Sequence, residues 1–321
     1  MAKPKVLLYE QMHKKGIDYL SKHADILWAS GYDEETLSRE AAEVTAIVIR
    51  AKGAVTAKIM DSAPLLRVIG RHGVGVDNID VAAATERGIY VVNTPGVNNE
   101  AVAEHAVGMM VALSKRMLEG DRAIRSGYWD FRYEDSGQEM VGRTLGIVGL
   151  GNIGYRVAEI CHVAFRMKIL YCDEIQKPEG ERDLSAQRVD LEELLRSSDY
   201  VSLHVPALPS TFHLINSDNI SLMKSTAFLT NTSRGSVVDG TALYTALKDR
   251  RIAGAGLDVF EEEPLPKDND LLKLSNAVLT PHMASHTEEA MMAMAMVVED
   301  VVSVIQGRTP KHPVNMLDAQ T

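Results

Sequence analysis

The pattern of apolar and polar positions divides the chain into short apolar runs that alternate with segments of helical periodicity. Buried parallel strands read as continuous Val, Ile and Leu runs, and their alternation with helices predicts parallel sheets covered by helices on both faces. The runs fall into two series, so the pattern predicts two such sheets. The first series comprises Lys5–Tyr9, Ala46–Arg50, Arg67–Arg71 and Tyr90–Asn93, and the second comprises Thr144–Val148, Lys168–Asp173, Tyr200–Val205, Thr226–Thr232, Gly254–Val259 and Ala277–Thr280.

Two long segments of helical periodicity flank the second series. Glu100–Glu119 precedes it and Thr287–Gln306 follows it. We therefore expect the chain to leave a first domain near Pro95–Asn99 and to return to it near the C-terminal end. The predicted bounds are residues 1–98 and 286–321 for a discontinuous domain and residues 99–285 for a continuous one. A length of 321 residues agrees with two domains that each bury a core.

The charge balance excludes some classes of partner. Lys and Arg number 34 against 44 Asp and Glu, which gives a formal net charge of −10. Nucleic acids and anionic membrane surfaces require a basic face, so we expect no partner of either kind. The apolar stretch Met291–Ile305 is interrupted by Glu299 and Asp300, and the first residues lack a signal-peptide core, so the expected location is cytoplasmic. Cys161 and Cys172 lack the spacing of a metal site, and no metal is expected.

The segment Gly149-Leu-Gly-Asn-Ile-Gly154 has the pattern of a phosphate-binding turn. It follows a predicted strand and opens a segment of helical periodicity, and this context makes an otherwise weak motif specific. Gly149 permits a tight turn, Gly151 lets the backbone approach a pyrophosphate, and Gly154 lets helix and strand pack closely. The free N–H groups and the positive dipole end of the helix favour a phosphate group there.

The next predicted strand ends at Asp173, about 20 residues after the glycines, where a ribose-binding acid is expected. Its carboxylate can accept hydrogen bonds from the ribose hydroxyls of an adenine dinucleotide. A 2′-phosphate would meet the negative charges of Asp173 and Glu174, with no Arg beside them in the sequence. We therefore expect NAD rather than NADP. The alternative is a turn that binds no ligand, followed by a surface carboxylate.

Three further charged residues, Arg234, Glu263 and His282, come shortly after three successive strands of the second series. Because parallel strands present their carboxyl ends at one edge of a sheet, we expect these side chains near the cofactor. Arg binds a carboxylate in bidentate geometry, an imidazole moves a proton, and a carboxylate orients and stabilises the charged imidazole. A hydroxy-acid dehydrogenase needs these groups. The alternatives are a surface ion pair for Arg234 and a solvated edge for the run Glu261–Glu263.

Several segments match, in order, those of one known family. They are Gly70–Asp80, Asn93–Gly96, Val102–His105, the glycine loop, Asn231–Gly235, Gly256–Pro264 and Thr280–His282. This set resembles the D-isomer-specific 2-hydroxyacid dehydrogenase family, and the first half is most similar to 3-phosphoglycerate dehydrogenases. The sequence stops soon after the second long helical segment, so the C-terminal regulatory domain of many such enzymes is not expected.

The resemblance implies an α/β fold of two doubly wound parallel-sheet domains with the active site between them. A Rossmann-type NAD domain would take residues 99–285, and a flavodoxin-like substrate domain would take residues 1–98 and 286–321. By position, Arg234 would bind the substrate carboxylate and carbonyl oxygen, His282 would be the acid/base, and Glu263 would be the acidic partner of His282. In the oxidation direction, neutral His282 would accept the hydroxyl proton while C2 passes a hydride to the nicotinamide.

The resemblance also implies contacts with cofactor and substrate. Asp258 would hold the nicotinamide carboxamide, and Arg50 with nearby Lys52 could bind a second anion such as a phosphate or sulfonate. His105 and His286 receive no role. Further cofactor contacts are expected from Gly149, Gly151, Asn152, Ile153, Gly154, Asp173, Thr232, Ser233 and Ser285, and substrate contacts from Arg50, Gly73, Val74, Gly75 and Asn98.

The expected activity is NAD-dependent hydride transfer at C2 of a small D-2-hydroxy acid, with 3-phosphoglycerate as one candidate. Glyoxylate, hydroxypyruvate and sulfolactate stay open, because His286 lies where relatives vary. Formate dehydrogenases pair the His with Gln, so Glu263 argues against that activity. The alternatives of another class are a non-enzymatic NAD sensor similar to C-terminal-binding corepressors and a structural subunit. We also expect a homodimer through the cofactor domain, with Tyr128–Tyr133 as its contact surface.

Overall fold

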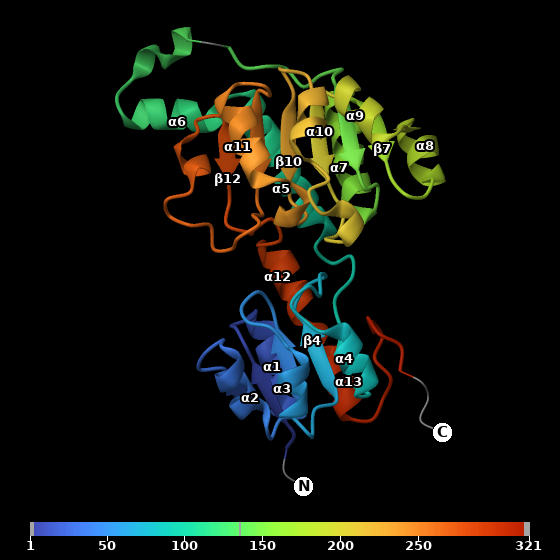
Figure 1. Ribbon diagram of the computed structural model, residues 1–321. Helices are drawn as coiled ribbons and strands as arrows, with labels where there is room; N and C mark the ends of the chain where they lie inside the picture. Colours follow the sequence, from blue (N-terminus) through green and yellow to red (C-terminus); the bar gives the residue numbers. More distant parts are fainter. Residues whose placement is uncertain (1–2, 135, 318–321) are drawn as a thin grey trace. The chain divides into compact units, whose positions relative to one another are not determined.

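Helices and parallel strands alternate along the computed structural model, which describes residues 3–134 and 136–317. The other residues, although they fall within the expected domain bounds, lie outside the described part of the chain. The chain divides into two units (Figure 1). The first consists of the residues before Asn99 and after Ser285, and the second runs from Asn99 to Ser285. Each unit is a parallel sheet with helices on both faces, so the predicted α/β fold class is confirmed.

The first unit contains a five-stranded sheet in the order β2-β1-β3-β4-β5, with every pair parallel. The strands are β1 (Lys5–Leu8), β2 (Asp25–Trp28), β3 (Ala46–Ile49), β4 (Val68–Arg71) and β5 (Tyr90–Val92). The apolar pattern does not indicate β2. This strand lies at the edge of the sheet and is largely exposed, so it lacks the continuous aliphatic run of a buried strand.

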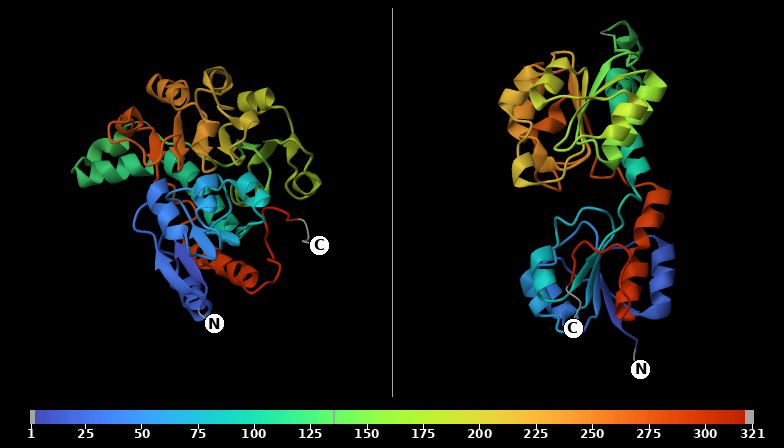
Figure 2. Two further views of the ribbon diagram at one scale, coloured as in Figure 1. Left: turned by 60° about the horizontal axis from the view of Figure 1, so that its bottom comes forward. Right: turned by 90° about the vertical axis from the view of Figure 1, so that its right-hand side faces the viewer.

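Alternate residues of these strands face two different sets of helices. Val6 and Leu8 pack in one apolar cluster with α1 (Lys14–His23) and α13 (Val297–Ile305), whereas Leu7 packs in another with the helices of the opposite face. Figure 2 shows the two helical layers on either side of the sheet. The helices of the second layer are α2 (Glu34–Ala41), α3 (Ala57–Asp61) and α4 (Val81–Glu86).

Both long helical segments are shorter in the structure than the periodicity predicts. The expected helix Thr287–Gln306 is two helices, α12 (Glu288–Ala295) and α13, which separate at Met296. Likewise, the expected helix Glu100–Glu119 is α5 (Asn99–Ser114) followed by α6 (Met117–Arg125). Arg116 between them has φ 53°, a left-handed conformation that ends a right-handed helix.

The second unit contains a seven-stranded parallel sheet in the order β12-β11-β10-β9-β6-β7-β8. The strand order reverses between β9 and β6, and ligands of such sheets bind at the carboxyl ends of the strands near this point. The strands are β6 (Thr144–Val148), β7 (Lys168–Cys172), β8 (Gln187–Arg188), β9 (Tyr200–Leu203), β10 (Phe228–Asn231), β11 (Gly254–Leu257) and β12 (Ala277–Leu279). The pattern does not indicate β8, because its two residues are polar and exposed.

Helices cover both faces of this sheet as well. On one face, α5 and α7 (Asn152–Phe165) share an apolar cluster with the strands, and on the other face α9 to α11 share a second cluster. The remaining helices of the unit are α8 (Pro178–Leu184), α9 (Leu191–Ser197), α10 (Ser217–Leu222), α11 (Gly240–Lys248) and four short 3-10 segments, Trp129–Tyr133, Pro209–Thr211, Gly235–Val237 and Asp270–Lys273. Within the described ranges, no helix combines the length and the apolar character needed to cross a bilayer.

Candidate active site

The glycine loop joins β6 to α7, and its three glycines have three different surroundings. Gly149 has φ +90°, and a Cβ added there would lie 2.8 Å from the carbonyl oxygen of His204. A Cβ on Gly154 would lie 2.2 Å from the carbonyl oxygen of Gly149, so the first turn of the helix can pack here only without a side chain. A Cβ on Gly151 would meet open space. The loop is therefore tight on its protein side and open where Gly151 precedes the first helical residue, Asn152.

The carboxylate of Asp173 lies at the end of β7, directly against this loop. Its Oδ2 accepts the N–H of Leu150 at 2.9 Å and lies 3.7 Å from Nζ of Lys177. Arg188 donates Nη2–H to the carbonyl oxygens of Asp173 and Glu174, at 2.8 and 2.9 Å. The expectation that no Arg stands beside Asp173 is therefore wrong. It fails because β8, which the pattern does not indicate, pairs with β7 and carries Arg188 to this place.

The loop and its surroundings fit an adenine dinucleotide. The open edge at Gly151 leaves room for a pyrophosphate beside the N-terminus of α7. Directly after β10, the hydroxyl of Thr232 is buried and has no hydrogen-bond partner among the described residues, as expected of a group that meets a ligand. Ser233 differs, since its hydroxyl donates to Oδ1 of Asn231 at 2.8 Å. Ile153 and Ser285 are partly exposed.

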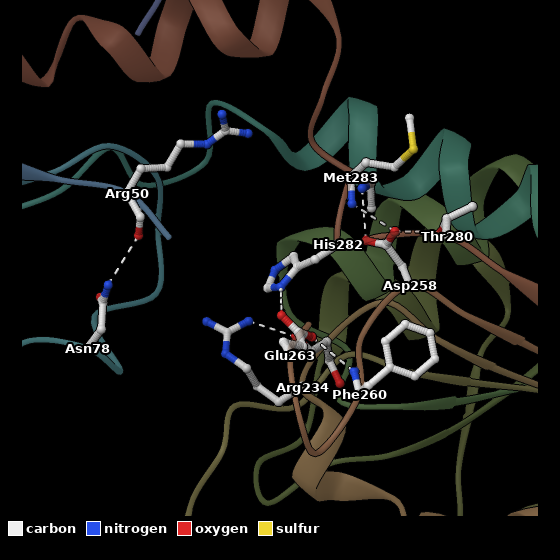
Figure 3. Close-up of polar contacts among 11 residues, drawn as sticks. Arg50, Asn78, Arg234, Asp258, Phe260, Glu263, Thr280, His282 and Met283 are labelled. Carbon is white, nitrogen blue, oxygen red and sulfur yellow. Dashed lines mark hydrogen bonds and ion pairs between the residues drawn. The ribbon is translucent and has the colours of Figure 1, made fainter. Parts of the chain in front are cut away.

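Arg234, Glu263 and His282 follow three neighbouring strands, β10, β11 and β12, and the structure brings them together at one sheet edge (Figure 3). Nδ1 of His282 lies 2.7 Å from Oε2 of Glu263. The other carboxylate oxygen, Oε1, accepts the N–H of Phe260 at 2.9 Å, which fixes the rotation of the carboxylate. In Figure 3 the guanidinium of Arg234 points toward Glu263. The three groups that the sequence analysis selects therefore form one cluster.

The environment of Glu263 keeps its carboxylate ionised. Burial alone would raise the pKa of Glu263. The hydrogen bonds with His282 and with the N–H of Phe260, together with the positive charge of Arg234, outweigh burial and lower this pKa below its ordinary value. An ionised carboxylate can only accept hydrogen bonds, so Nδ1 of His282 carries the hydrogen and Nε2 is the nitrogen left for a substrate.

Asp258 anchors the loop that carries His282. Its side chain is fully buried and accepts hydrogen bonds from Oγ1 of Thr280 at 2.6 Å and from the N–H groups of Met283 and Ala284, both at 2.8 Å. Its carbonyl oxygen accepts the N–H of His282 at 2.8 Å. These contacts are additional to the expected contact of Asp258 with the nicotinamide carboxamide. In the sequence, only the position of Thr280 directly before Pro281 and His282 indicates contacts of this kind for Asp258.

In the first unit, the residues expected to contact substrate have mixed surroundings. Nη2 of Arg50 lies 3.3 Å from Nδ1 of His286, whereas Nζ of Lys52 lies over the ring of Tyr32, 5.3 Å from its centroid. The two cations therefore have different partners in the structure. Oδ1 of Asn98 is buried and has no hydrogen-bond partner within the described residues.

The loop Gly73–Gly75, also expected at the substrate, is held by the chain that follows β5. Gly73 has φ +131°, which favours glycine, and its carbonyl oxygen accepts the N–H and the hydroxyl of Thr94. The carbonyl oxygen of Val74 accepts Nδ2–H of Asn93 at 2.7 Å. The side chain of Val74 is exposed, and Gly75 is partly exposed. The loop is thus rigidly attached at its base.

Comparison with known proteins identifies the class to which this fold and site belong. The sequence profile of the NAD-binding domain of D-isomer-specific 2-hydroxyacid dehydrogenases matches residues 107–284. The chain is 43% identical over 320 residues to a glyoxylate reductase of Korarchaeum cryptofilum, covering 98% of this chain and 96% of that protein. It is 40% identical over 314 residues to a D-3-phosphoglycerate dehydrogenase of Archaeoglobus fulgidus, covering 97% of this chain but only 59% of that longer protein.

A solved structure leads to the same class. The NADPH-dependent glyoxylate/hydroxypyruvate reductase of Sinorhizobium meliloti, in complex with NADP and malonate, superposes with a TM-score of 0.88 at 30% identity, covering 98% of this chain and 97% of that one. The chain belongs to the D-isomer-specific 2-hydroxyacid dehydrogenase family. It is an NAD-dependent oxidoreductase that acts on a small 2-hydroxy or 2-keto acid.

Proposed function

We propose that the protein reduces a small 2-keto acid of the size of glyoxylate or hydroxypyruvate to the corresponding 2-hydroxy acid, the D isomer where C2 becomes a stereocentre, with Arg234, Glu263 and His282 as its catalytic residues. One observation carries this proposal: the 2.7 Å contact between His282 and Glu263, beside Arg234 and in the same unit as the glycine loop. The relatives named glyoxylate reductase, matched over nearly their full length, support the small substrate.

Each residue has a role that follows from its chemistry. The Arg234 guanidinium binds the substrate carboxylate and carbonyl oxygen, because its planar fork matches a carboxylate. The His282 imidazolium donates its Nε2 proton to the carbonyl oxygen as that oxygen gains charge. The Glu263 carboxylate stabilises the imidazolium and holds Nδ1–H, so that Nε2 is presented to the substrate. A bound NADH would supply the hydride for C2.

The cofactor would be held by the second unit. The backbone around Gly151 and Asn152 would receive the pyrophosphate at the N-terminus of α7, and Asp173 would receive the adenosine ribose. The buried Thr232 hydroxyl would gain a partner in the bound state. Further contacts are proposed for Gly149, Ile153, Gly154, Ser233, Asp258 and Ser285, and substrate contacts for Arg50, Gly73, Val74, Gly75 and Asn98.

A second candidate substrate is the phosphorylated keto acid 3-phosphohydroxypyruvate. The guanidinium of Arg50 beside His286 would offer donors to a phosphate, and two relatives, of Archaeoglobus fulgidus and Methanocaldococcus jannaschii, are named D-3-phosphoglycerate dehydrogenase. The contact of Lys52 with Tyr32 weighs against this candidate, because it takes away the second cation that the phosphate would use. The smaller keto acids are therefore the first choice.

Initial rates of NADH oxidation with four keto acids test the proposal: glyoxylate, hydroxypyruvate, 3-phosphohydroxypyruvate and sulfopyruvate. We expect kcat/KM for one of the first two to exceed that for the phosphorylated acid by about tenfold or more. A preference for the phosphorylated acid that Arg50→Gln abolishes would establish the second candidate instead. Turnover of none of the four would refute the proposed reaction, as a sensor that binds NAD without chemistry would behave in this way.

We further propose that the protein forms a homodimer through the second unit. Five large apolar side chains of α6 and the following 3-10 segment are exposed: Met117, Leu118, Ile124, Trp129 and Tyr133. Isolated surface apolar residues are common, but a group of this size on one segment is typical of an interface. Sedimentation should give twice the mass of one chain, and Ile124→Glu should lower it to a single chain. A single chain for the unaltered protein would refute the dimer.

A further inference from the structure

Helix α5 lies directly on β11 because two glycines of that strand offer no side chains. A Cβ on Gly254 would lie 3.2 Å from Cδ2 of Leu113, and a Cβ on Gly256 would lie 2.9 Å from Cβ of Met109. Along the helix, four residues advance about 6 Å, and along the strand, two residues advance about 6.6 Å. Helix and strand therefore stay in register with opposite directions, Leu113 over Gly254 and Met109 over Gly256.

The next step of this register places His105 opposite Asp258. Nε2 of His105 lies 3.6 Å from Oδ1 of Asp258 and 3.0 Å from Oγ1 of Thr280. The Thr280 hydroxyl in turn lies 2.6 Å from the same Asp258 oxygen. The imidazole is mostly buried, with 22% of its side chain exposed. Three side chains from α5, β11 and the end of β12 thus form one continuous chain of hydrogen bonds.

Counting protons fixes the direction of these hydrogen bonds. The Thr280 hydroxyl has a single hydrogen, and it donates this hydrogen to the Asp258 carboxylate. The hydroxyl oxygen can then only accept from His105, so Nε2 of His105 carries a hydrogen. His105 therefore orients the Thr280 hydroxyl, and the hydroxyl in turn helps to hold the Asp258 carboxylate.

The other end of this series of hydrogen bonds is the loop that carries His282. Asp258 binds the N–H groups of Met283 and Ala284, and its carbonyl oxygen binds the N–H of His282. His282 has φ +48°, a left-handed conformation that a residue with a Cβ adopts only when its surroundings hold it there. Loss of a donor at one end should loosen the loop that holds His282 in this conformation.

We propose that His105 is a positioning residue for His282, acting through Thr280 and Asp258. The inference rests on the proposed acid/base role of His282. In this scheme, His105 does not exchange its proton with the substrate. It supplies a fixed donor that keeps the Asp258 carboxylate, and hence the His282 loop, in the geometry of reaction.

Two matched pairs of variants test this inference by steady-state kinetics with NADH and the best keto acid. His105→Leu and Thr280→Val remove the donor and the hydroxyl, whereas His105→Gln and Thr280→Ser retain a donor and a hydroxyl at similar places. We expect His105→Leu and Thr280→Val each to lower kcat about tenfold, with KM changed by less than about threefold. His105→Gln and Thr280→Ser should restore kcat to within about threefold of the unaltered protein.

We expect the kcat of the double variant of His105→Leu and Thr280→Val to lie within about twofold of the kcat of the slower single variant. Both substitutions interrupt the same chain of hydrogen bonds, so their effects should not multiply. A kcat within about twofold of normal in both single variants would overturn the inference, as would single effects that multiply in the double variant. If His105→Leu fails to fold, Thr280→Val alone decides. His282→Ala, measured in parallel, separates the two claims: if it keeps a normal rate, the proposed function fails, and if only it is slow, the role of His105 fails.

Discussion

Replacing Glu263 by Gln removes one negative charge from the His282 pair and leaves the size of the side chain almost unchanged. The amide would place an NH2 group or a carbonyl oxygen opposite Nδ1 of His282, where a carboxylate oxygen now lies at 2.7 Å. The N–H of Phe260 requires an acceptor at Oε1, so the NH2 group is expected to face the imidazole. It would then donate to Nδ1, and the hydrogen of the neutral ring would move to Nε2.

The size of the effect follows from charge and exposure. Two unit charges about 4 Å apart interact by roughly 4 kcal/mol at an effective dielectric constant of about 20. His282 and Glu263 are 51% and 35% exposed, so solvent screens part of this energy. A remaining loss of about 2–3 kcal/mol in the transition state lowers kcat by about 30- to 150-fold. The same exposure predicts a change of less than about 1 kcal/mol in the free energy of unfolding.

Steady-state rates in both directions and denaturant unfolding of the variant measure these two effects. Glu262→Gln is the matched control, because it removes a neighbouring exposed charge that takes no part in the pair. We expect Glu262→Gln to keep kcat within about twofold. The reasoning is refuted if Glu263→Gln keeps a normal kcat, or if its activity is lost only in proportion to lost folded protein.

Three further predictions concern the loop, the buried carboxylate and pH. Gly151→Val should fold normally but raise the Kd for NADH by about tenfold or more, whereas Gly154→Val should not fold stably, because its Cβ would lie 2.2 Å from a carbonyl oxygen. Fluorescence titration and thermal unfolding would distinguish them, and equal NADH affinity in Gly151→Val would contradict the loop assignment. Asp258→Ala should lower the free energy of unfolding by about 2–5 kcal/mol, since it leaves the N–H groups of Met283 and Ala284 without their acceptor; a loss below about 1 kcal/mol in denaturant unfolding would contradict this. The lowered pKa of Glu263 means that its pair with His282 stabilises the fold fully above the ordinary Glu pKa of 4.5, and that this contribution is lost as pH falls through the lower folded pKa. Unfolding free energies measured from neutral to acid pH should therefore fall less steeply in Glu263→Gln than in the unaltered protein, and parallel curves would contradict the assignment.

The parts of the site that the sequence predicts are those fixed by local chemistry. The glycine loop has a strand before it and a helix after it, and Gly149 and Gly154 answer steric demands of that turn, whereas Gly151 borders open space. Arg234, Glu263 and His282 follow three successive buried strands, and parallel pairing brings consecutive strand ends to one edge. In these cases, position along the chain already determines position in the sheet.

The parts that the sequence does not predict depend on pairing between distant segments. β8 is two polar residues long, so neither the strand nor the approach of Arg188 to Asp173 can be read from apolar pattern. In the sequence, His105 is indistinguishable from other residues of a helix. Its contact with Thr280 depends on the glycines of β11, which let α5 pack directly against that strand. The left-handed backbone at Arg116 separates α5 from α6, and no Pro or Gly at this position indicates the break in the sequence.

The fate of a labelled hydride tests the proposed transfer to C2 directly. NADH that carries deuterium in place of both hydrogens at C4, incubated with the protein and hydroxypyruvate or another chain-bearing 2-keto acid that it turns over, should give a D-configured 2-hydroxy acid with deuterium at C2. The same incubation with His282→Ala should give this product about a hundredfold or more slowly while NADH binding stays near normal. An unlabelled product, a product of L configuration, or an equal rate with His282→Ala would contradict the account.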